Sequence, residues 1–537
     1  MKQEAVQQLH LKSVNHQIMA NDFINISKEV VNDFIQNVIF VDDRAHTNGK
    51  TLLEFDATSV ASIFANDGKI CAIYTPETIG NPDAFFKVMN KADAVVLDWD
   101  MREELNGDLN TIKNEEDEED EDPRGRLTCN LINSIIQNAQ GIKVILIYTG
   151  DTNVYGICDK IKGYVENAFY DEDNLRVFND HIIVAVRAKY NDSDEQFKHI
   201  PLLKKFIVKY EKLPQCLIEQ YVKLTNGLIS NFALRALTTI RNSTPQILSV
   251  FSPTLDNGYM AHKASMAFSE DAYLLLIKLF GDALSDLLTC KMPYVSEWSE
   301  AWIDEFIGDD EIEINTVSIS RTKELLKSIL SSQQTTLGEK LKKILKEEKG
   351  RYVKEDFEKI EKAGPSITSL FSSGNNDLEL SNVKFAELTH HKNIFSRQPI
   401  HPVLSLGSVI KDSNDKFYIC IQQRCDSVRI KNKRQFLFLP LSKEGRNPVM
   451  IHGERFFPSR TTYAIKTIEF STRKGEKVIT AEIKDGKNIF VSNEGNKYEW
   501  IVDLKDLHAQ RIANEYCSQL SRVGLDESEW LRLHGIN

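Results

Sequence analysis

The chain has 537 residues, which is too long for a single hydrophobic core and predicts roughly three or four domains. With 42% hydrophobic and 27% charged residues it has the composition of an ordinary soluble protein. No apolar run reaches membrane-spanning length, and the opening MKQEAVQQLHLKSVNHQ lacks the apolar core of a signal peptide. The sequence therefore predicts a cytoplasmic protein that does not enter a membrane.

Charge is spread unevenly along the chain. The net charge is −12, but the part from Arg397 to the end carries +6, which leaves −18 for everything before it. Eight cysteines are scattered, and the pair Cys420 and Cys425 has the wrong spacing for a zinc knuckle. We expect the cysteines to be reduced thiols. We also expect the basic C-terminal part to form a region distinct from the acidic remainder of the chain.

The first 200 residues alternate strand-like and helical patterns. Apolar residues at helical spacing over 21–36 lead into the first strand, and further helices are predicted over 82–90 and 127–139. This rhythm predicts a parallel sheet covered by helices. Its five strands are predicted at VIFVDD (38–43), KICAIY (69–74), AVVLDWDM (94–101), VILIYTGD (144–151) and IIVAVRAK (182–189).

The remaining segments differ from this pattern. Eight consecutive acids at 115–122 repel one another and bury nothing, which predicts a disordered insertion near 108–124. Later, apolar residues recur every three or four positions, and beyond 378 the period changes to two. The predicted division is a helical extension (1–29), a parallel α/β domain (30–195), a helical domain (196–364), a linker (365–377) and a small β-barrel-like module ending in a helix (378–537).

Polar chemistry follows four of the five predicted strands. Ligands bind outside the carboxyl ends of strands in open α/β sheets, so these four ends are expected to converge. Carboxylates crowded there would repel one another unless a divalent cation lay between them, and hard oxygen ligands favour Mg²⁺. Such a site stabilises a transferring phosphoryl group with its metal, an ammonium and a hydroxyl. The candidates are Asp42, Asp43, Asp98, Thr149 and Lys189.

The order of these residues resembles the receiver domain of response regulators: an acidic pair after the first strand, Asp after the third, Thr after the fourth and Lys after the fifth. Met101, Gly107 and Gly150 agree with that pattern, whereas Arg102, Arg187 and Tyr190 depart from it. The resemblance covers about residues 30–200. It implies that Asp98 is the phospho-acceptor, that Asp42 and Asp43 join Asp98 in binding Mg²⁺, and that Thr149 and Lys189 contact phosphoryl oxygens.

Two other interpretations of the acidic residues remain open. Asp98-Trp99-Asp100 also resembles the DxD motif of haloacid-dehalogenase-like phosphatases. In that family the metal-binding acidic pair follows the lysine, whereas Asp42 and Asp43 come first here, so the order favours a receiver. The third interpretation is a degenerate α/β fold without phosphoryl chemistry, because any such sheet places polar residues at its strand ends.

The C-terminal module carries a basic segment. Between residues 397 and 460 there are 12 Lys and Arg against 5 Asp and Glu. A basic β-module is typical of nucleic-acid binding or cleavage, although lysines also protect edge strands. Cys425 is flanked by arginine and is a conceivable nucleophile. The candidate nucleic-acid contacts are Arg424, Arg429, Lys431, Lys433 and Arg434.

Histidines offer no comparable pattern. His262, His390, His391 and His401 lack acidic or cysteine partners at ligand spacing, so surface or packed histidines are expected.

The whole layout is similar to receiver-containing proteins of bacterial antiphage defence. That similarity implies a two-component signalling protein whose receiver, phosphorylated by a cognate histidine kinase or engaged by another defence protein, regulates the helical and β-rich regions. Enzymatic activity and oligomeric state are left open.

Overall fold

The computed structural model describes residues 23–45, 55–75, 82–101, 125–138, 141–165, 167–190, 201–266, 272–292, 296–314, 317–331, 339, 364–372, 378–392 and 401–520. The chain forms two compact units, residues 1–308 and 309–537. The predicted acidic insertion near 108–124, residues 1–22 of the predicted extension and the end of the predicted terminal helix lie outside the described residues. No helix in the described part of the chain is long and apolar enough to cross a membrane.

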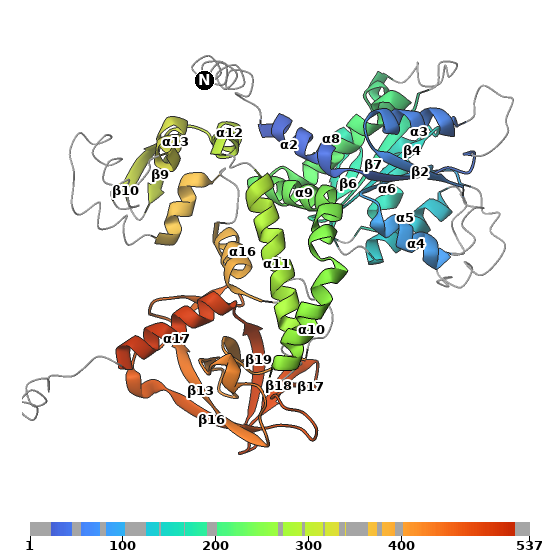
Figure 1. The fold of residues 1–537 in the computed structure, drawn as a ribbon. Helices are drawn as coiled ribbons and strands as arrows, with labels where there is room; N and C mark the ends of the chain where they lie inside the picture. The colour runs from blue at the N-terminus through green and yellow to red at the C-terminus, as the bar shows by residue number, and fades with distance from the viewer. Residues whose placement is uncertain are drawn as a thin grey trace, which may run out of the picture. The chain divides into compact units, whose positions relative to one another are not determined.

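The first unit is built on an eight-stranded sheet in the order β2-β1-β3-β4-β7-β6-β5, with β8 paired to the end of β7 (Figure 1). The first five strands in that order are parallel, and β5 and β6 form an antiparallel hairpin at the edge. The strands are β1 (Asn37–Val41), β2 (Ile70–Tyr74), β3 (Ala94–Leu97), β4 (Lys143–Thr149), β5 (Phe169–Asp171), β6 (Arg176–Phe178), β7 (Ile182–Lys189) and β8 (Ile207–Val208).

Helices cover both faces of this sheet, which explains why its central strands are continuous apolar runs. Every residue of β3 and β4 is buried. Helices α4 (Pro82–Lys91), α5 (Arg126–Asn138) and α6 (Val154–Lys162) pack on one face. Helices α2 (Phe23–Phe34), α3 (Ala57–Asn66) and α8 (Leu213–Thr225) pack on the other.

The predicted α/β sheet with parallel strands is confirmed, but it is wider than the five strands expected. The chain between β4 and β7 adds the hairpin β5–β6, and the chain after β7 returns to add β8. These additions use strands of two or three residues, which are too short to show a period-two pattern.

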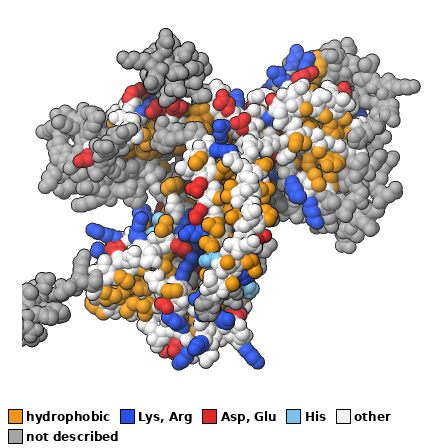
Figure 2. Space-filling model, viewed as in Figure 1, with side chains coloured by type: hydrophobic (Ala, Val, Ile, Leu, Met, Phe, Trp, Pro, Cys, Tyr) orange, Lys and Arg blue, Asp and Glu red, His pale blue; other side chains and the backbone are white. Residues whose placement is uncertain are grey.

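A helical region follows the sheet, as predicted. It consists of α9 (Leu228–Val250), α10 (Asp256–Ser265), α11 (Ala272–Lys291) and α12 (Ser296–Phe306). Hydrophobic side chains gather on the surface of α11 (Figure 2), where Tyr273, Leu274 and Ile277 are each more than half exposed.

Helix α9 is joined to the sheet by an ion pair at the amino end of β3, in which the carboxylate is buried and the guanidinium is about a third exposed. Asp93 is 7% exposed and accepts hydrogen bonds from both terminal nitrogens of Arg241, at 2.7 and 3.1 Å. The same carboxylate accepts the amides of Gln36 and Asn37, at 2.9 and 3.1 Å. One carboxylate therefore holds α9, the start of β1 and the start of β3 together.

The second unit opens with a β-hairpin, which corrects the expectation that residues 196–364 are helical throughout. Strands β9 (Asp310–Ile314) and β10 (Val317–Arg321) are antiparallel, and α13 (Lys323–Ser331) follows. At the start of the predicted linker, residues 364–371 form the 3₁₀ helix η9 (Gly364–Phe371). The guanidinium of Arg321 donates to Asp310 and to carbonyls of Ser369 and Ser372, so it ties the hairpin to η9.

An antiparallel sheet forms the rest of this unit, as predicted, between α16 (Leu378–His390) and α17 (Asp506–Leu520). One face packs around Phe436, Phe438 and Phe470, and the other packs against α17. An isolated bridge joins Phe470 to Ser492, just beyond β18. The strands are β11 (Ser408–Lys411), β12 (Phe417–Cys420), β13 (Lys433–Ser442), β14 (Val449–Ile451), β15 (Glu454–Pro458), β16 (Lys466–Ser471), β17 (Glu482–Lys484), β18 (Lys487–Val491) and β19 (Lys497–Asp503).

Candidate functional site

Three carboxylates converge at the carboxyl edge of the parallel strands. Asp42 and Asp43 follow β1 and Asp98 follows β3, and one oxygen of each lies within 4.8 Å of the others. The backbone hydrogen bonds of the sheet continue past the ends of β1 and β3. The amide of Asp98 donates to the carbonyl of Val41 at 2.9 Å, and the amide of Asp42 donates to the carbonyl of Tyr74 at 3.1 Å. Asp42 and Asp98 are 0% and 4% exposed. The sheet itself therefore fixes the positions of these buried acids.

Lys189, the last residue of β7, lies between two of these carboxylates. Its Nζ is 2.7 Å from Asp42 Oδ2 and 2.8 Å from Asp98 Oδ1. Burial alone would lower the pKa of Lys189, but the charges of Asp98 and Asp42 outweigh it and raise the pKa above its ordinary value. The ammonium also lies 5.9 Å from the ring centres of Phe55 and Tyr148. The lysine is thus a fixed positive charge within the acidic cluster.

Asp98 differs electrostatically from an ordinary aspartate. Its pKa is raised from 3.8 to about 6, mainly because the group is buried; Lys189 opposes this rise, and Asp42 and Asp43 add to it. Burial therefore makes the ionised form of Asp98 energetically unfavourable. A divalent cation bound beside it would stabilise that ionised form.

Thr149 ends β4, the strand between β3 and β7, and its side chain is buried. Its hydroxyl accepts a hydrogen bond from the amide of Asp151 at 3.0 Å. Within the described residues this hydroxyl makes no hydrogen bond to a carboxylate of the site. The structure therefore brings Asp42, Asp43, Asp98 and Lys189 together and leaves Thr149 at the neighbouring strand end.

The contacts that Thr128 and Gly125 make with the turn after Asp98 were not predicted from the sequence. The buried Thr128 hydroxyl, in the first turn of α5, donates to the carbonyl of Asp98 at 2.7 Å and contacts that of Trp99 at 3.2 Å. Gly125, just before α5, has φ +80°, and the ring of the buried Trp99 fills the place where a Cβ would lie. The only sequence signal was the glycine where regular structure resumes after the acidic run.

We expect Gly125→Ala to lower the free energy of unfolding by about 2–4 kcal/mol. A left-handed φ is strained for alanine, and its Cβ would lie 2.1 Å from Cζ2 of Trp99. Urea denaturation measures the change. Gly141→Ala is the control, because a Cβ there meets nothing within 4 Å. Equal stability of the two variants would contradict the packing of Trp99 against Gly125.

Arg187, which departs from the receiver pattern, is 8% exposed on β7. Its guanidinium donates to the carbonyls of Asn174 and Val186, at 2.9 and 2.7 Å, and lies 5.7 Å from the ring centre of Phe206. Arg187 thus ties β7 to the β5–β6 turn. Arg102 and Gly107 lie outside the described residues.

The basic residues predicted to contact nucleic acid are largely engaged with acids. Arg424 pairs with Asp506 at 2.8 Å, Arg434 with Asp426 at 2.9 Å, and Lys433 with Glu469 at 3.2 Å. Arg429 has a left-handed backbone, with φ +59°. Cys425 is a free, exposed thiol. Nucleic-acid binding by this segment stays a prediction.

Two of the histidines, His390 on α16 and His508 on α17, stack face to face with ring centres 3.9 Å apart. Burial, and then the neighbouring His390, lower the pKa of His508 from 6.5 to about 4, while its Nε2 contact with the Pro448 carbonyl opposes the shift. Burial also lowers the pKa of His390 and of His391. The charged groups that act on this cluster are Arg511, Lys505 and Glu387.

The stability of the second unit should therefore fall with acidification. His508 has a pKa of 6.5 in the unfolded chain and about 4 in the folded protein, so the unfolded chain takes up a proton more readily. The contribution of this residue to stability is complete above pH 6.5 and is lost as the pH falls toward about 4. We expect a loss of about 1–2 kcal/mol after solvent screening, measured by urea denaturation at a series of pH values. His508→Gln should flatten this dependence and His401→Gln, at an exposed site, should not. An unchanged slope in His508→Gln would contradict the assignment.

The parallel strand order and the acidic cluster at its carboxyl edge define a receiver-like class of α/β domain. A protein-family model described as a response receiver domain matches residues 34–194. This match confirms the resemblance predicted from the motifs, over less than a third of the chain. A comparison with curated proteins gives no match.

Proposed function

We propose that residues 34–194 accept a phosphoryl group on the carboxylate of Asp98 and thereby regulate the rest of the chain. The observation that carries this proposal is the convergence of Asp42, Asp43 and Asp98 with Lys189 between two of them. The match to response receiver domains supports the phosphoryl-accepting role.

The acidic cluster fits Mg²⁺ by the chemistry of its donors. Three carboxylates offer hard oxygen ligands within 4.8 Å of one another, and two of the acids are buried. Asp42, Asp43 and Asp98 would hold the ion, which supplies positive charge to the oxygens of the transferring group when bound.

Asp98 would act as nucleophile. A carboxylate oxygen of Asp98 forms a bond to phosphorus while the bond from phosphorus to the leaving group of the donor breaks, and the leaving group keeps the electron pair. The Lys189 ammonium, which already contacts Asp98, would neutralise a phosphoryl oxygen, and Thr149 would donate its hydroxyl to another. The product carries about −1.5 to −2 charge where the free site carried one carboxylate.

We further propose how the whole chain is organised, where it acts and in which process. The separate roles of the α/β domain, the helical region and the β-rich module, the barrel closure of the C-terminal strands, the cytoplasmic location and the role in bacterial antiphage defence all belong to this proposal. The donor would be a cognate histidine kinase, and the regulated part would be the helical and β-rich regions. The bridge between Phe470 and Ser492 supports barrel closure.

Intact-mass measurement tests the proposal directly. The full chain, incubated with Mg²⁺ and acetyl phosphate, is expected to gain one phosphoryl group, and Asp98→Asn is expected to gain none. Asp100→Asn is the matched control, because Asp100 is a half-buried neighbour outside the three-carboxylate cluster. No gain in the unmodified chain, or an equal gain in Asp98→Asn, would overturn the assignment. Turnover of a generic phosphomonoester, lost in Asp98→Asn, would instead favour the phosphatase interpretation.

A further inference from the structure

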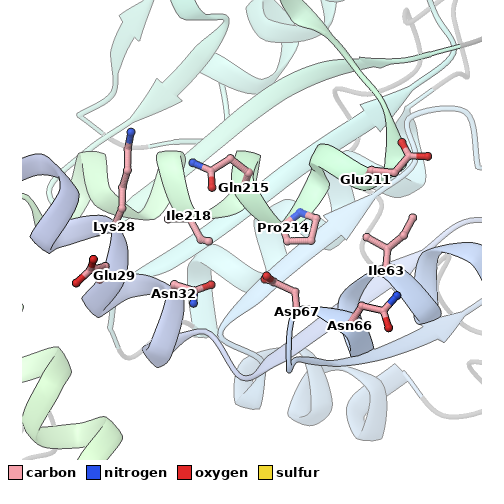
Figure 3. A pocket seen from close by; sticks show the side chains of 10 residues that line it. All are labelled: Lys28, Glu29, Asn32, Ile63, Asn66, Asp67, Glu211, Pro214, Gln215 and Ile218. Atoms are coloured by element: carbon pink, nitrogen blue, oxygen red, sulfur yellow. The ribbon is translucent and has the colours of Figure 1, made fainter.

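The first unit exposes a large apolar surface on helix α11. A recess of about 620 Å³ between α2, α3 and α8 is lined mainly by polar side chains (Figure 3). The first half of α11 is different, because Lys278 is the one charged residue between positions 272 and 280, and Ala272 is the one buried residue there. A helix that is hydrophobic on most of its sides is normally covered by other helices.

Helix α11 packs on α9 along one side. The ring centre of Phe280 lies 5.6 Å from that of Phe251, which ends α9, and Nζ of Lys291 donates to the hydroxyl of Ser243 at 3.0 Å. These two contacts run in opposite directions along the two helices. Helix α11 is therefore antiparallel to α9, and its first half extends past the end of α9.

A second side of α11 has the spacing of a coiled-coil seam. Leu274, Gly281 and Leu288 recur every seven residues. Ile277 and Leu284 follow the first two of them by three residues. We call these five residues the α11 seam. Leu274, Ile277 and Gly281 are exposed, while Leu284 and Leu288 are half-buried, so the seam is open to a further helix.

The exposed apolar area of α11 is large enough for a stable dimer. It amounts to about 700 Å², which exceeds the roughly 300–600 Å² of the largest apolar patch on a typical monomer. It is close to the roughly 800 Å² that each partner buries in a standard interface. The residues that contribute this area are Tyr273, Leu274, Leu276, Ile277, Leu279 and Phe280.

Gly281 lies at the centre of the seam and suits the close approach of a second helix. Glycine is unfavourable inside a helix compared with alanine. A Cβ at this position would meet nothing within 4 Å, so packing within the described chain does not require glycine. A partner helix that crosses α11 here would require it, because the missing side chain lets two backbones come close.

The seam is complementary to itself when a second α11 runs in the opposite direction. With Gly281 at the centre, Leu274 faces Leu288 of the partner subunit. Lys278 and Asp282 are exposed and lie one turn apart on the same side of the helix. A two-fold axis reverses the helix direction, so it brings Lys278 near Asp282 of the partner subunit, and does so twice. This symmetry of charge favours a second copy of the chain over an unrelated partner.

We propose that α11 is a homodimer interface, in which the α11 seams of two copies of this chain pack antiparallel about a two-fold axis at Gly281. Apolar area, heptad spacing and paired charges each support this interface. No residue of α11 belongs to the cluster of Asp42, Asp43 and Asp98, so the proposal does not depend on phosphoryl transfer.

Sedimentation equilibrium of the full chain tests the proposal. The unmodified chain is expected to have twice the mass of one chain. The double variant Leu274→Glu, Ile277→Glu should raise the dissociation constant about a hundredfold, because it places charges in the seam. The control variant, Leu330→Glu with Leu507→Glu, changes two exposed leucines outside α11 and should sediment as the unmodified chain does. Circular dichroism verifies that both variants are folded.

Mixing two charge variants tests the two-fold arrangement. Lys278→Glu and Asp282→Lys should each weaken self-association about tenfold, because like charges then meet across the axis. An equimolar mixture of these two variants restores opposite charges at both pairs. The mixture should therefore associate as tightly as the unmodified chain.

Three results would overturn the proposal. A full chain that stays monomeric at high micromolar concentration would show that another part of the chain, or a different protein, covers α11. An equal loss of association in the seam variant and its control would place the interface elsewhere. Failure of the mixed charge variants to recover association would exclude the antiparallel two-fold pairing.

Discussion

Lys189→Met is expected to lower the free energy of unfolding by about 3–5 kcal/mol when no divalent cation is present. The substitution removes the ammonium between Asp42 and Asp98 and leaves two buried carboxylates facing each other. The loss should shrink as the pH falls and should begin to do so above pH 6, because removal of Lys189 raises the pKa of Asp98 further and the protonated acid no longer repels Asp42. Urea denaturation followed by circular dichroism measures both effects.

Lys87→Met is the matched control for this prediction. Lys87 is exposed on α4, so its loss should change the free energy of unfolding by less than about 0.5 kcal/mol. Millimolar Mg²⁺ should restore part of the stability of Lys189→Met, because it replaces the missing positive charge. A loss below about 1 kcal/mol in Lys189→Met would contradict the burial of the carboxylates.

Asp93→Ala is expected to produce a loss of similar size, about 3–5 kcal/mol, at the opposite edge of the sheet. It leaves the guanidinium of Arg241 and the amides of Gln36 and Asn37 without the carboxylate that they share. Asp93→Asn, which keeps one acceptor oxygen, should give a smaller loss. Urea denaturation reports the stability, and limited proteolysis within α9 reports the release of that helix.

A second ion pair to the same helix provides the comparison. Asp33 on α2 pairs with Arg235 on α9 at 3.0 Å, but both side chains are 40–50% exposed. Asp33→Ala should therefore change the free energy of unfolding by less than about 1 kcal/mol. Equal losses in Asp33→Ala and Asp93→Ala would show that burial of Asp93 does not determine its contribution.

The central strands could be predicted because burial on both faces requires continuous apolar runs. β3 and β4 are such runs, and the polar residue that ends each one is visible in the sequence. The convergence of Asp42, Asp98 and Lys189 could be predicted in the same way, because the carboxyl ends of parallel strands lie at one edge of the sheet. Helices with a strong apolar stripe, such as α2 and α5, were equally predictable.

Features that depend on pairing or on distant contacts could not be predicted. β9 (Asp-Glu-Ile-Glu-Ile) and β10 (Val-Ser-Ile-Ser-Arg) each alternate with period two, but each has only five residues and the pair follows a long helical region, so the hairpin was missed. The partners Thr128 and Asp98 are 30 residues apart, and Arg241 and Asp93 are 148 apart, so nothing in local periodicity connects them. Three-residue strands such as β5 carry too few residues for a pattern.

The short strand β8 limits how the site can respond to a change of charge at Asp98. Ala188 is paired with Thr149 on one side and with Ile207 on the other, and Lys189 is paired with Val208. The Tyr148 hydroxyl donates to the carbonyl of Val208 at 2.7 Å and secures the pairing. Ala188 is thus paired on both sides, and the backbone of the neighbouring Lys189 is held by its pairing with β8. A change of charge at Asp98 would therefore be met by movement of the Lys189 side chain while its paired backbone stays in place.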